Sequence, residues 1–349
     1  MPFPIPPTRP DGSRRTSSKM AEENTIDEAN LGSRDGVGAW LEFQATMISM
    51  AVVSRLPRFM QNGLVSFLAR IAMKLDKRHT QAARTFIGQA LGPEAAKEDW
   101  RIHRAYVNLF QMSIDSHAFE RKVPMDKVLD HYEIDAIPEV RAAWASGRGA
   151  VLVTSHIGDW EAGAAIMPHV GMAPAHVVAR PPKNRYLSKH LLKVRERKRI
   201  TVLPRRGGMK QIGAVIEQGG WIAMLLDQRS RGKHVLAPFF GRPTTCERSV
   251  PVLLKRLRMP IAFCACYNTD RPFYYKFTFP RLIEPEELDG MSIEEIVTLL
   301  NHEQEKLIMN HPEQYFWLHD RYRDAPPMPA EGAAESKATP KDNSSAVPS

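Results

Sequence analysis

The spacing of apolar residues along the chain changes near residue 130. Before that point apolar residues recur every three or four positions, as in Trp40, Phe43, Met47 and Met50, and this pattern predicts helices over residues 38–120. From Tyr132 onward, short apolar runs alternate with helix-like stretches. The expected strands are residues 150–155, 175–179, 201–203, 221–226, 235–239, 260–267 and 273–279. The expected helices between them lie near residues 160–167, 184–199, 208–218, 248–258 and 292–310.

Alternation of strands and helices predicts an α/β fold, with a central, mostly parallel or mixed sheet flanked by helices and an N-terminal helical layer. The aromatic run at 273–279 is typical of an antiparallel edge. We expect one domain over residues 36–324, with the helical layer at 36–130 and the α/β core at 131–324. Residues 1–35 and 325–349 are rich in Pro, Ser, Gly and Ala, so we expect them to be disordered tails.

Composition narrows the class of protein. Hydrophobic residues make up 43% of the chain, which excludes disorder of the whole chain. The 3 cysteines are too few for a disulfide framework and indicate a reducing compartment. No apolar stretch is long enough for a spanning helix, and the proline-rich N-terminus does not resemble a secretory signal. We therefore expect a soluble or membrane-surface protein that faces the cytoplasm.

The first candidate for chemistry is the segment from His156 to Glu161, which follows a buried strand. Functional sites of open α/β sheets gather at such strand ends. Gly158 allows a turn there, so Glu161 could hold one imidazole nitrogen of His156 and leave the other free to accept a proton. The alternative is that Asp159 and Glu161 are only acids at a helix start and His156 is a satisfied turn residue. Ser155 lacks the flanking glycines of a nucleophile elbow, because position 153 is valine.

The second candidate is a basic segment at residues 180–210, with 12 Lys or Arg and 1 acid, in a chain of net charge +9. This charge should attract phosphate-bearing lipids or an acidic carrier protein, although a solvated charged face is the simpler alternative. We find no nucleic-acid-binding module and expect no nucleic acid partner. DNA binding that depends on salt and survives loss of His156 would indicate otherwise.

A third candidate is Asp227 with Gln228, again after an apolar strand. Asp227 could orient an arginine or a substrate hydroxyl, or could form a purely structural ion pair. Cys264 and Cys266 lack partner ligands at zinc spacing, so we expect no metal site and assign them to core packing.

Together these stretches resemble the bacterial lipid A biosynthesis (late) acyltransferase family, within the lysophospholipid and glycerolipid acyltransferase superfamily. The resemblance covers about Trp40 to Arg323. It rests on six motifs in the family's order: His156-Ile-Gly-Asp-Trp-Glu161, Arg180-Pro-Pro-Lys-Asn184, Arg195, Gly219 with Asp227 and Gln228, Phe239-Phe-Gly-Arg-Pro243, and His311-Pro-Glu-Gln-Tyr-Phe-Trp-Leu-His319.

The resemblance implies a glycerolipid-acyltransferase-like fold and acyl transfer from a thioester of acyl carrier protein or coenzyme A to a hydroxyl of a membrane glycolipid. His156 would be the general base and Glu161 its orienting carboxylate, with no acyl-enzyme and no metal or redox cofactor. Arg195, or backbone amides at the helix start, would stabilise the oxyanion. The remaining site residues implied are Arg180, Asn184, Asp227, Gln228 and Arg242, which would bind substrate, and Asp159, which replaces the family's usual asparagine.

The acceptor is expected to be an anionic lipid A precursor at the cytoplasmic face of the bacterial inner membrane, where the protein would be peripheral or monotopic. The charge-free stretch from Phe43 to Ser54 is too short to span a bilayer, so it either lies in the headgroup region or packs on the core. Two alternatives stay open: a lysophospholipid, phosphoglycolipid or aminolipid acyltransferase of the same fold, and a non-enzymatic lipid-binding scaffold.

Overall fold

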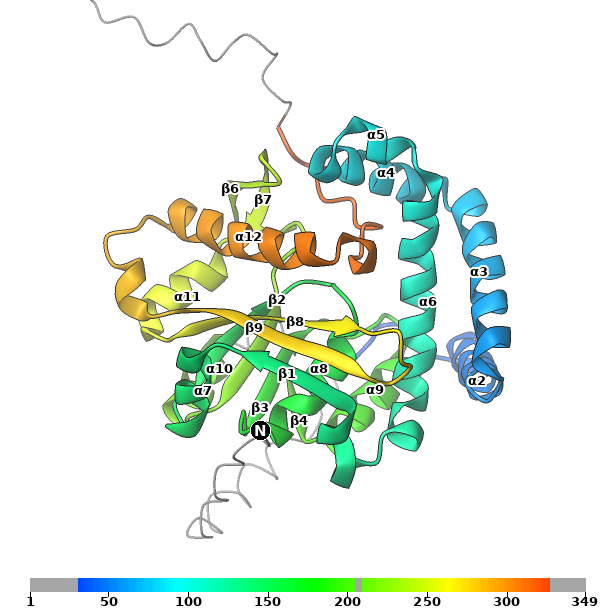
Figure 1. The fold of residues 1–349 in the computed structure, drawn as a ribbon, viewed down its shortest axis with the longest axis horizontal. Coiled ribbons are helices and arrows are strands. Elements are labelled where there is room, and N and C mark those ends of the chain that lie inside the picture. Colours follow the sequence, from blue (N-terminus) through cyan, green and yellow to red (C-terminus); the bar gives the residue numbers. More distant parts are fainter. Residues whose placement is uncertain (1–30, 205–208, 327–349) are drawn as a thin grey trace, which may run out of the picture.

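A seven-stranded mixed sheet forms the centre of the computed structural model, which describes residues 31–204 and 209–326 (Figure 1). The strand order is β1-β9-β8-β2-β5-β3-β4, and every neighbouring pair is parallel except β8 with β9. The bounds are β1 Tyr132–Ala136, β2 Ala150–Thr154, β3 Ala175–Ala179, β4 Ile200–Pro204, β5 Trp221–Leu225, β8 Ile261–Asn268 and β9 Tyr275–Ile283. The predicted α/β class is therefore confirmed.

Helices cover both faces of this sheet. Along β2, Val151 and Val153 belong to one apolar cluster while Ala150 and Leu152 belong to another, as expected for a strand buried on both sides. The covering helices are α7 Pro138–Ala145, α8 Trp160–Ile166, α9 Arg185–Arg197, α10 Met209–Glu217, α11 Ser249–Leu257 and α12 Ile293–Asn310.

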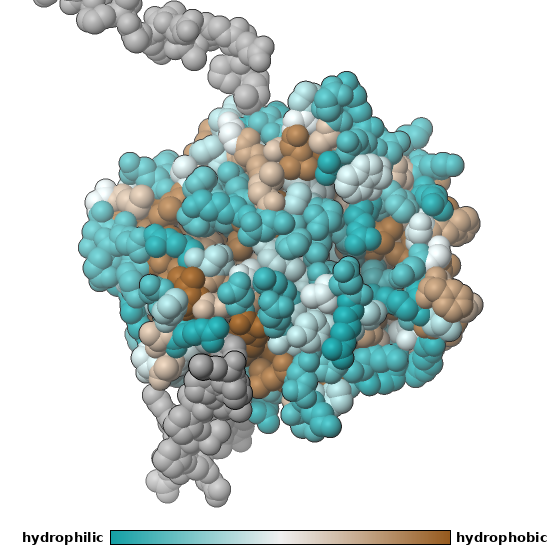
Figure 2. Space-filling model, viewed as in Figure 1, coloured by the Kyte–Doolittle hydropathy of each residue, from teal (hydrophilic) through white to brown (hydrophobic). Residues whose placement is uncertain are grey.

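The expected N-terminal helical layer is present. It comprises α2 Val37–Val53, α3 Arg58–Leu75, α4 Lys77–Leu91, α5 Pro93–Lys97 and α6 Asp99–Lys122. The long helix α6 lies beside the sheet, with α2 and α3 outside it (Figure 1). Apolar side chains are exposed over α3 at the outer edge of the molecule (Figure 2).

Two expectations about the strands were incomplete. The run 235–239 is a strand, β6 His234–Phe239, but it pairs only with β7 Arg242–Glu247 in a separate antiparallel ribbon that contacts α12. The edge strand β1 and the strand β7 are not among the expected strands, because both are rich in polar residues and neither forms an apolar run.

The N-terminal boundary of the ordered domain also moves. Within the tail expected at 1–35, Leu31 is buried and the Arg34 amide donates to the Lys183 carbonyl over 2.8 Å. At the other end, the Ala325 amide bonds to Tyr322. The remainder of the two predicted tails, residues 1–30 and 327–349, lies outside the described residues.

Candidate active site

His156 and Asp227 meet at the carboxyl ends of two neighbouring parallel strands. His156 lies in the turn after β2, and Asp227 follows β5, which pairs with β2. His156 Nδ1 is 2.8 Å from Asp227 Oδ1, and the His156 backbone amide donates to Oδ2 over 2.9 Å. The Asp227 side chain is 2% exposed and that of His156 is 21% exposed. One buried carboxylate therefore fixes both the ring and the backbone of His156.

Electrostatics keep Asp227 ionised. Burial alone would raise the pKa of Asp227, but the neighbouring His156 charge and its two hydrogen bonds outweigh burial and lower the pKa to about 2. A carboxylate on Nδ1 selects the tautomer that bears its proton on Nδ1, which leaves Nε2 as an acceptor. Gln228 Nε2 lies 3.4 Å from His156 Nε2 and can donate a long hydrogen bond to it, so Gln228 borders the nitrogen that would accept a proton.

Glu161 does not pair with His156 in the way that the family resemblance implies. Its Oε1 accepts a bond of 2.5 Å from Arg195 on α9, and both side chains are partly buried. Within the described residues, no hydrogen bond joins Glu161 to His156. The expected pairing is therefore replaced by two separate pairs, His156 with Asp227 and Glu161 with Arg195.

Asp159 is the N-cap of α8. Its Oδ1 accepts a hydrogen bond of 2.9 Å from the Ala162 amide, as a capping aspartate does. Burial raises the pKa of Asp159 to about 7, against the effect of that hydrogen bond. Lys198 is also buried, and desolvation lowers the pKa of its ammonium. A buried cluster of charged groups thus lies behind the turn that carries His156.

Gly158 shapes this turn. Its φ is +59°, and a β-carbon there would lie 2.0 Å from the Cys266 carbonyl oxygen of β8. The Asp159 amide donates to that same carbonyl over 2.8 Å. Only glycine fits the conformation and the close approach, so Gly158 sets where His156 sits relative to the sheet.

The residues expected to bind substrate are in different situations. Arg180 is exposed and has no hydrogen bond or ion pair among the described residues. Asn184 is buried: its Oδ1 caps α9, and its Nδ2 donates to the Ala39 carbonyl over 2.8 Å. The Arg242 guanidinium stacks on the Tyr322 ring at 4.7 Å. The side chain of Asn184 therefore uses its hydrogen-bonding groups within the protein, whereas Arg180 is free to contact a ligand.

The basic segment divides in the same way. Arg195 and Arg197 pair with acids, and Lys198 is buried against the Phe119 ring. Within the described residues of this segment, four exposed basic side chains have no acidic partner: Arg180, Lys183, Lys193 and Arg199. Arg205 and Arg206 lie outside the described residues.

A C-terminal segment holds both loops of the site. The Phe316 amide donates to the His156 carbonyl over 2.9 Å, and the Gly158 amide donates to the Gln314 carbonyl over 3.2 Å. The Tyr315 hydroxyl bonds to Asp227. This segment was expected only as a family motif, since nothing in its own sequence shows that it lies beside His156.

His319 extends this support to the second loop. Its Nε2 accepts from the Arg229 amide over 3.1 Å, two residues beyond Asp227. Burial lowers the pKa of His319 to about 4, so the ring is neutral and able to accept that bond. Trp160 packs its ring at 5.0 Å from the His156 ring, which adds an apolar wall to the site.

Comparison with known proteins agrees with the motifs. A family model described as bacterial lipid A biosynthesis acyltransferase matches residues 34–324. Two curated proteins are each 24% identical over 209 residues: the lipid A biosynthesis palmitoleoyltransferase of Escherichia coli (strain K12) and the lipid A biosynthesis acyltransferase of Shigella flexneri. The matched part covers 58% of this chain and 65% of the length of each relative. The chain belongs to the bacterial lipid A biosynthesis acyltransferase family.

Proposed function

We propose that this protein transfers a fatty acyl chain from an acyl thioester to a hydroxyl of a lipid A precursor or a related membrane glycolipid, with His156 as general base. The observation that carries the proposal is the His156–Asp227 pair, whose Nδ1 contact of 2.8 Å leaves Nε2 as the acceptor nitrogen, with only the long contact of 3.4 Å to Gln228 for an acceptor hydroxyl to displace. Family membership gives the reaction class, and the pair supplies the group that the reaction needs.

In the proposed mechanism the acceptor hydroxyl attacks the thioester directly. Nε2 of His156 takes the proton of the acceptor hydroxyl while that oxygen attacks the thioester carbonyl carbon. The carbon–sulfur bond then breaks, the ester forms, and the thiolate receives the proton from the imidazolium. Asp227 stabilises the imidazolium between these steps, because its carboxylate stays charged beside Nδ1.

Direct attack is favoured over an acyl-enzyme. Ser155, the hydroxyl next to His156 in the chain, is fully buried, and its Oγ donates to Gln304 over 3.2 Å. A serine held in this way has no access to a thioester. The proposed route uses no metal or redox cofactor, since a base and oxyanion donors are sufficient for acyl transfer.

Glu161 and Arg195 take a revised role in this proposal. Their bond of 2.5 Å ties the start of α8 to α9, so it fixes the helix start that follows His156. Backbone amides at that helix start and the remaining N–H groups of Arg195 are the donors that we propose for the oxyanion. The four free basic side chains near α9 suit an acidic acyl carrier protein or the phosphates of coenzyme A.

We further propose that α2 and α3 rest on the membrane surface. The helix α2 contacts α6 and α9 with one side, yet Trp40, Leu41 and Ile48 are exposed on it. On α3, the exposed apolar residues include Phe59, Phe67 and Leu68. Patches of this kind mark interaction surfaces, and apolar helix faces beside basic residues suit an anionic membrane. No helix of the described segments has the length and apolarity that crossing a bilayer requires.

A reconstituted reaction tests the proposal. The full-length protein is incubated with an under-acylated lipid A and either acyl carrier protein or coenzyme A carrying a labelled acyl group, and products are read by mass spectrometry. We expect one added acyl chain with wild type and none with His156→Ala. Transfer only to lysophospholipids or aminolipids would replace the acceptor, and no transfer to any lipid would favour a non-enzymatic scaffold.

A further inference from the structure

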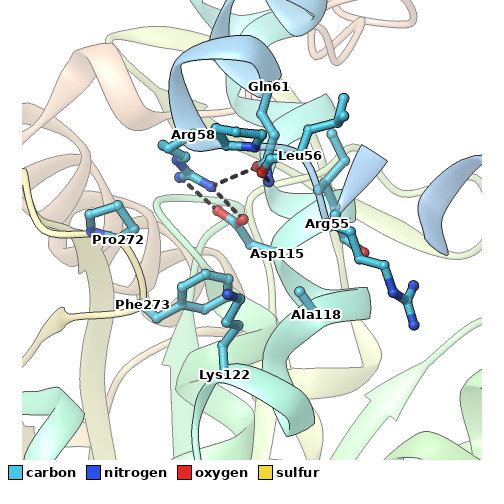
Figure 3. Close-up of a pocket in the computed structure, with 12 residues that line it drawn as sticks. Arg55, Leu56, Arg58, Gln61, Asp115, Ala118, Lys122, Pro272 and Phe273 are labelled. Carbon is cyan, nitrogen blue, oxygen red and sulfur yellow. Dashed lines mark hydrogen bonds and ion pairs between the residues drawn. The ribbon is translucent and has the colours of Figure 1, made fainter. Parts of the chain in front are cut away.

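A cavity of about 370 Å³ lies at the turn between α2 and α3 (Figure 3). Its walls come from that turn, from α6, and from the loop that joins β8 to β9. Neither His156 nor Asp227 lines it. Glu161 and Arg195 do not line it either, so the cavity has a different lining from the site proposed for acyl transfer.

Positive charge predominates in this cavity. Arg55, Arg58 and Lys122 line it, against a single carboxylate, Asp115. The guanidinium of Arg55 donates to the Ala51 carbonyl and points away from Asp115 (Figure 3), so Arg58 and Lys122 are the cations that face the cavity. Arg58 binds Asp115 through two bonds of 2.7 and 3.0 Å, so that carboxylate is already neutralised, and a third bond of 3.3 Å goes to Gln61. A guanidinium has five N–H donors, so two remain on Arg58. Lys122 is exposed and has no ion pair among the described residues, and Figure 3 shows it extending toward Asp115 and Phe273.

The rest of the lining is apolar. Leu56 and Pro57 form the turn, and Ile114 and Phe273 form the opposite wall. The residues next to the turn in sequence carry this character outward: Phe59 is 76% exposed and Val52 is 58% exposed. A ligand with an anionic group and an apolar continuation would match both parts of this surface.

The position of the cavity favours a membrane phospholipid as this ligand. It sits at the junction of the two helices whose exposed apolar faces we assign to the membrane. Over residues 37–75 the chain carries four basic residues, Arg55, Arg58, Arg70 and Lys74, and one acid, Glu42. That balance is complementary to a surface of anionic phospholipids. A phosphate bound in the cavity would leave its acyl chains to run along α2 and α3.

We propose that this cavity binds the phosphate of an anionic membrane phospholipid, through Lys122 and the two remaining N–H donors of Arg58. The inference rests on the proposed placement of α2 and α3 on the membrane. Binding there would hold the helix pair at a fixed depth and orientation at the headgroup level, and it would be separate from acceptor recognition. Phosphate is the expected group because Arg and Lys bind it through charge-assisted hydrogen bonds.

Titration of the full-length protein with dihexanoyl-phosphatidylglycerol below its micelle concentration tests the site without a membrane. We expect saturable binding in calorimetry, a Kd at least fivefold weaker in Lys122→Met, and recovery to within about twofold in Lys122→Arg. Lys74→Met is the matched control: it removes the same charge from exposed α3 and should bind like wild type. Dihexanoyl-phosphatidylcholine, which has the same chains and a zwitterionic headgroup, should bind more weakly.

Three outcomes would overturn the inference: no saturable binding by wild type, equal loss in Lys74→Met and Lys122→Met, or tighter binding of N-acetylglucosamine 1-phosphate than of phosphatidylglycerol. The last would assign the cavity to the acceptor glycolipid. No acyl donor is present, so the result is independent of the acyl transfer assay. If the protein transfers acyl chains but binds no phosphatidylglycerol, the phospholipid site is refuted and the proposed acyl transfer still stands.

Discussion

Replacing Asp227 by asparagine tests the assignment of the orienting carboxylate. In the wild type the two carboxylate oxygens have separate tasks: Oδ2 accepts from the His156 amide over 2.9 Å and Oδ1 contacts Nδ1 over 2.8 Å. Asparagine has one oxygen. If that oxygen takes the backbone amide, the side-chain NH₂ faces Nδ1 and the proton of the neutral ring moves to Nε2. His156, the proposed general base, would then carry a proton on the nitrogen that has to accept one.

The expected loss follows from the burial of this pair. A hydrogen bond to a charged group contributes about 1.5–3 kcal/mol, and each 1.4 kcal/mol in the barrier changes the rate about tenfold. Asp227 is 2% exposed, so water cannot replace the lost charge. We therefore expect the lost hydrogen bond to lower kcat about 10- to 150-fold, and the change of tautomer to lower it further.

The assay measures kcat with saturating acyl donor and detergent-solubilised acceptor, and circular dichroism confirms folding. Glu161→Gln is the matched control, because it also neutralises one carboxylate, here on the loop and helix that follow His156, but keeps a hydrogen bond to Arg195. Its kcat should stay within about tenfold of wild type. A loss in Glu161→Gln as large as in His156→Ala, with Asp227→Asn near wild type, would refute the reasoning and restore Glu161 as the partner of His156.

Three further variants probe the surroundings of this pair. The pKa of Asp159 is about 7 in the folded protein against 3.8 for an ordinary aspartate, so the folded state loses stability as pH rises from about 4 to 7. The melting temperature of Asp159→Asn should therefore depend less on pH over that range than the melting temperature of wild type, and an equal dependence would contradict this. Arg180→Ala should raise the KM for an anionic substrate about fivefold with kcat unchanged, because a surface cation contributes about 1 kcal/mol, and this effect should shrink at high salt. Tyr315→Phe removes one hydrogen bond to Asp227 and should lower kcat about 3- to 10-fold, whereas equal kcat would show that the bond is dispensable.

The sequence was most informative where strands are buried on both faces. The runs that became β2, β5 and β8 are nearly continuous in apolar residues, so their pattern was strong. Strand β1 reads Tyr-Glu-Ile-Asp-Ala at a sheet edge, and β7 reads Arg-Pro-Thr-Thr-Cys-Glu in the separate ribbon. Solvent on one side of β1 permits its two acids. In β7 the central polar residues are buried, and the hydroxyls of Thr244 and Thr245 donate to the carbonyls of Arg321 and Ser230, so no apolar run marks either strand.

The candidate site shows where local spacing stops being informative. Both His156 and Asp227 were recognised because each follows an apolar strand, yet they are 71 positions apart and meet only because β5 pairs with β2. Glu161 is expected as the partner of His156 because of the turn that Gly158 allows and because the family resemblance implies that pairing. The structure instead pairs Glu161 with Arg195 of α9, 34 positions away, and no local motif reveals that contact.

The most direct test of the central claim compares lipids from cells lacking this gene that carry wild type, His156→Ala or an empty vector. Mass spectrometry of the extracted lipid A and phospholipids reports every acyl chain at once. We expect cells with the empty vector to lack one acyl chain on a lipid A-type species, wild type to restore that chain, and His156→Ala to leave it missing. Full restoration by His156→Ala, or lipid A that is identical in all three strains while another lipid changes, would contradict it.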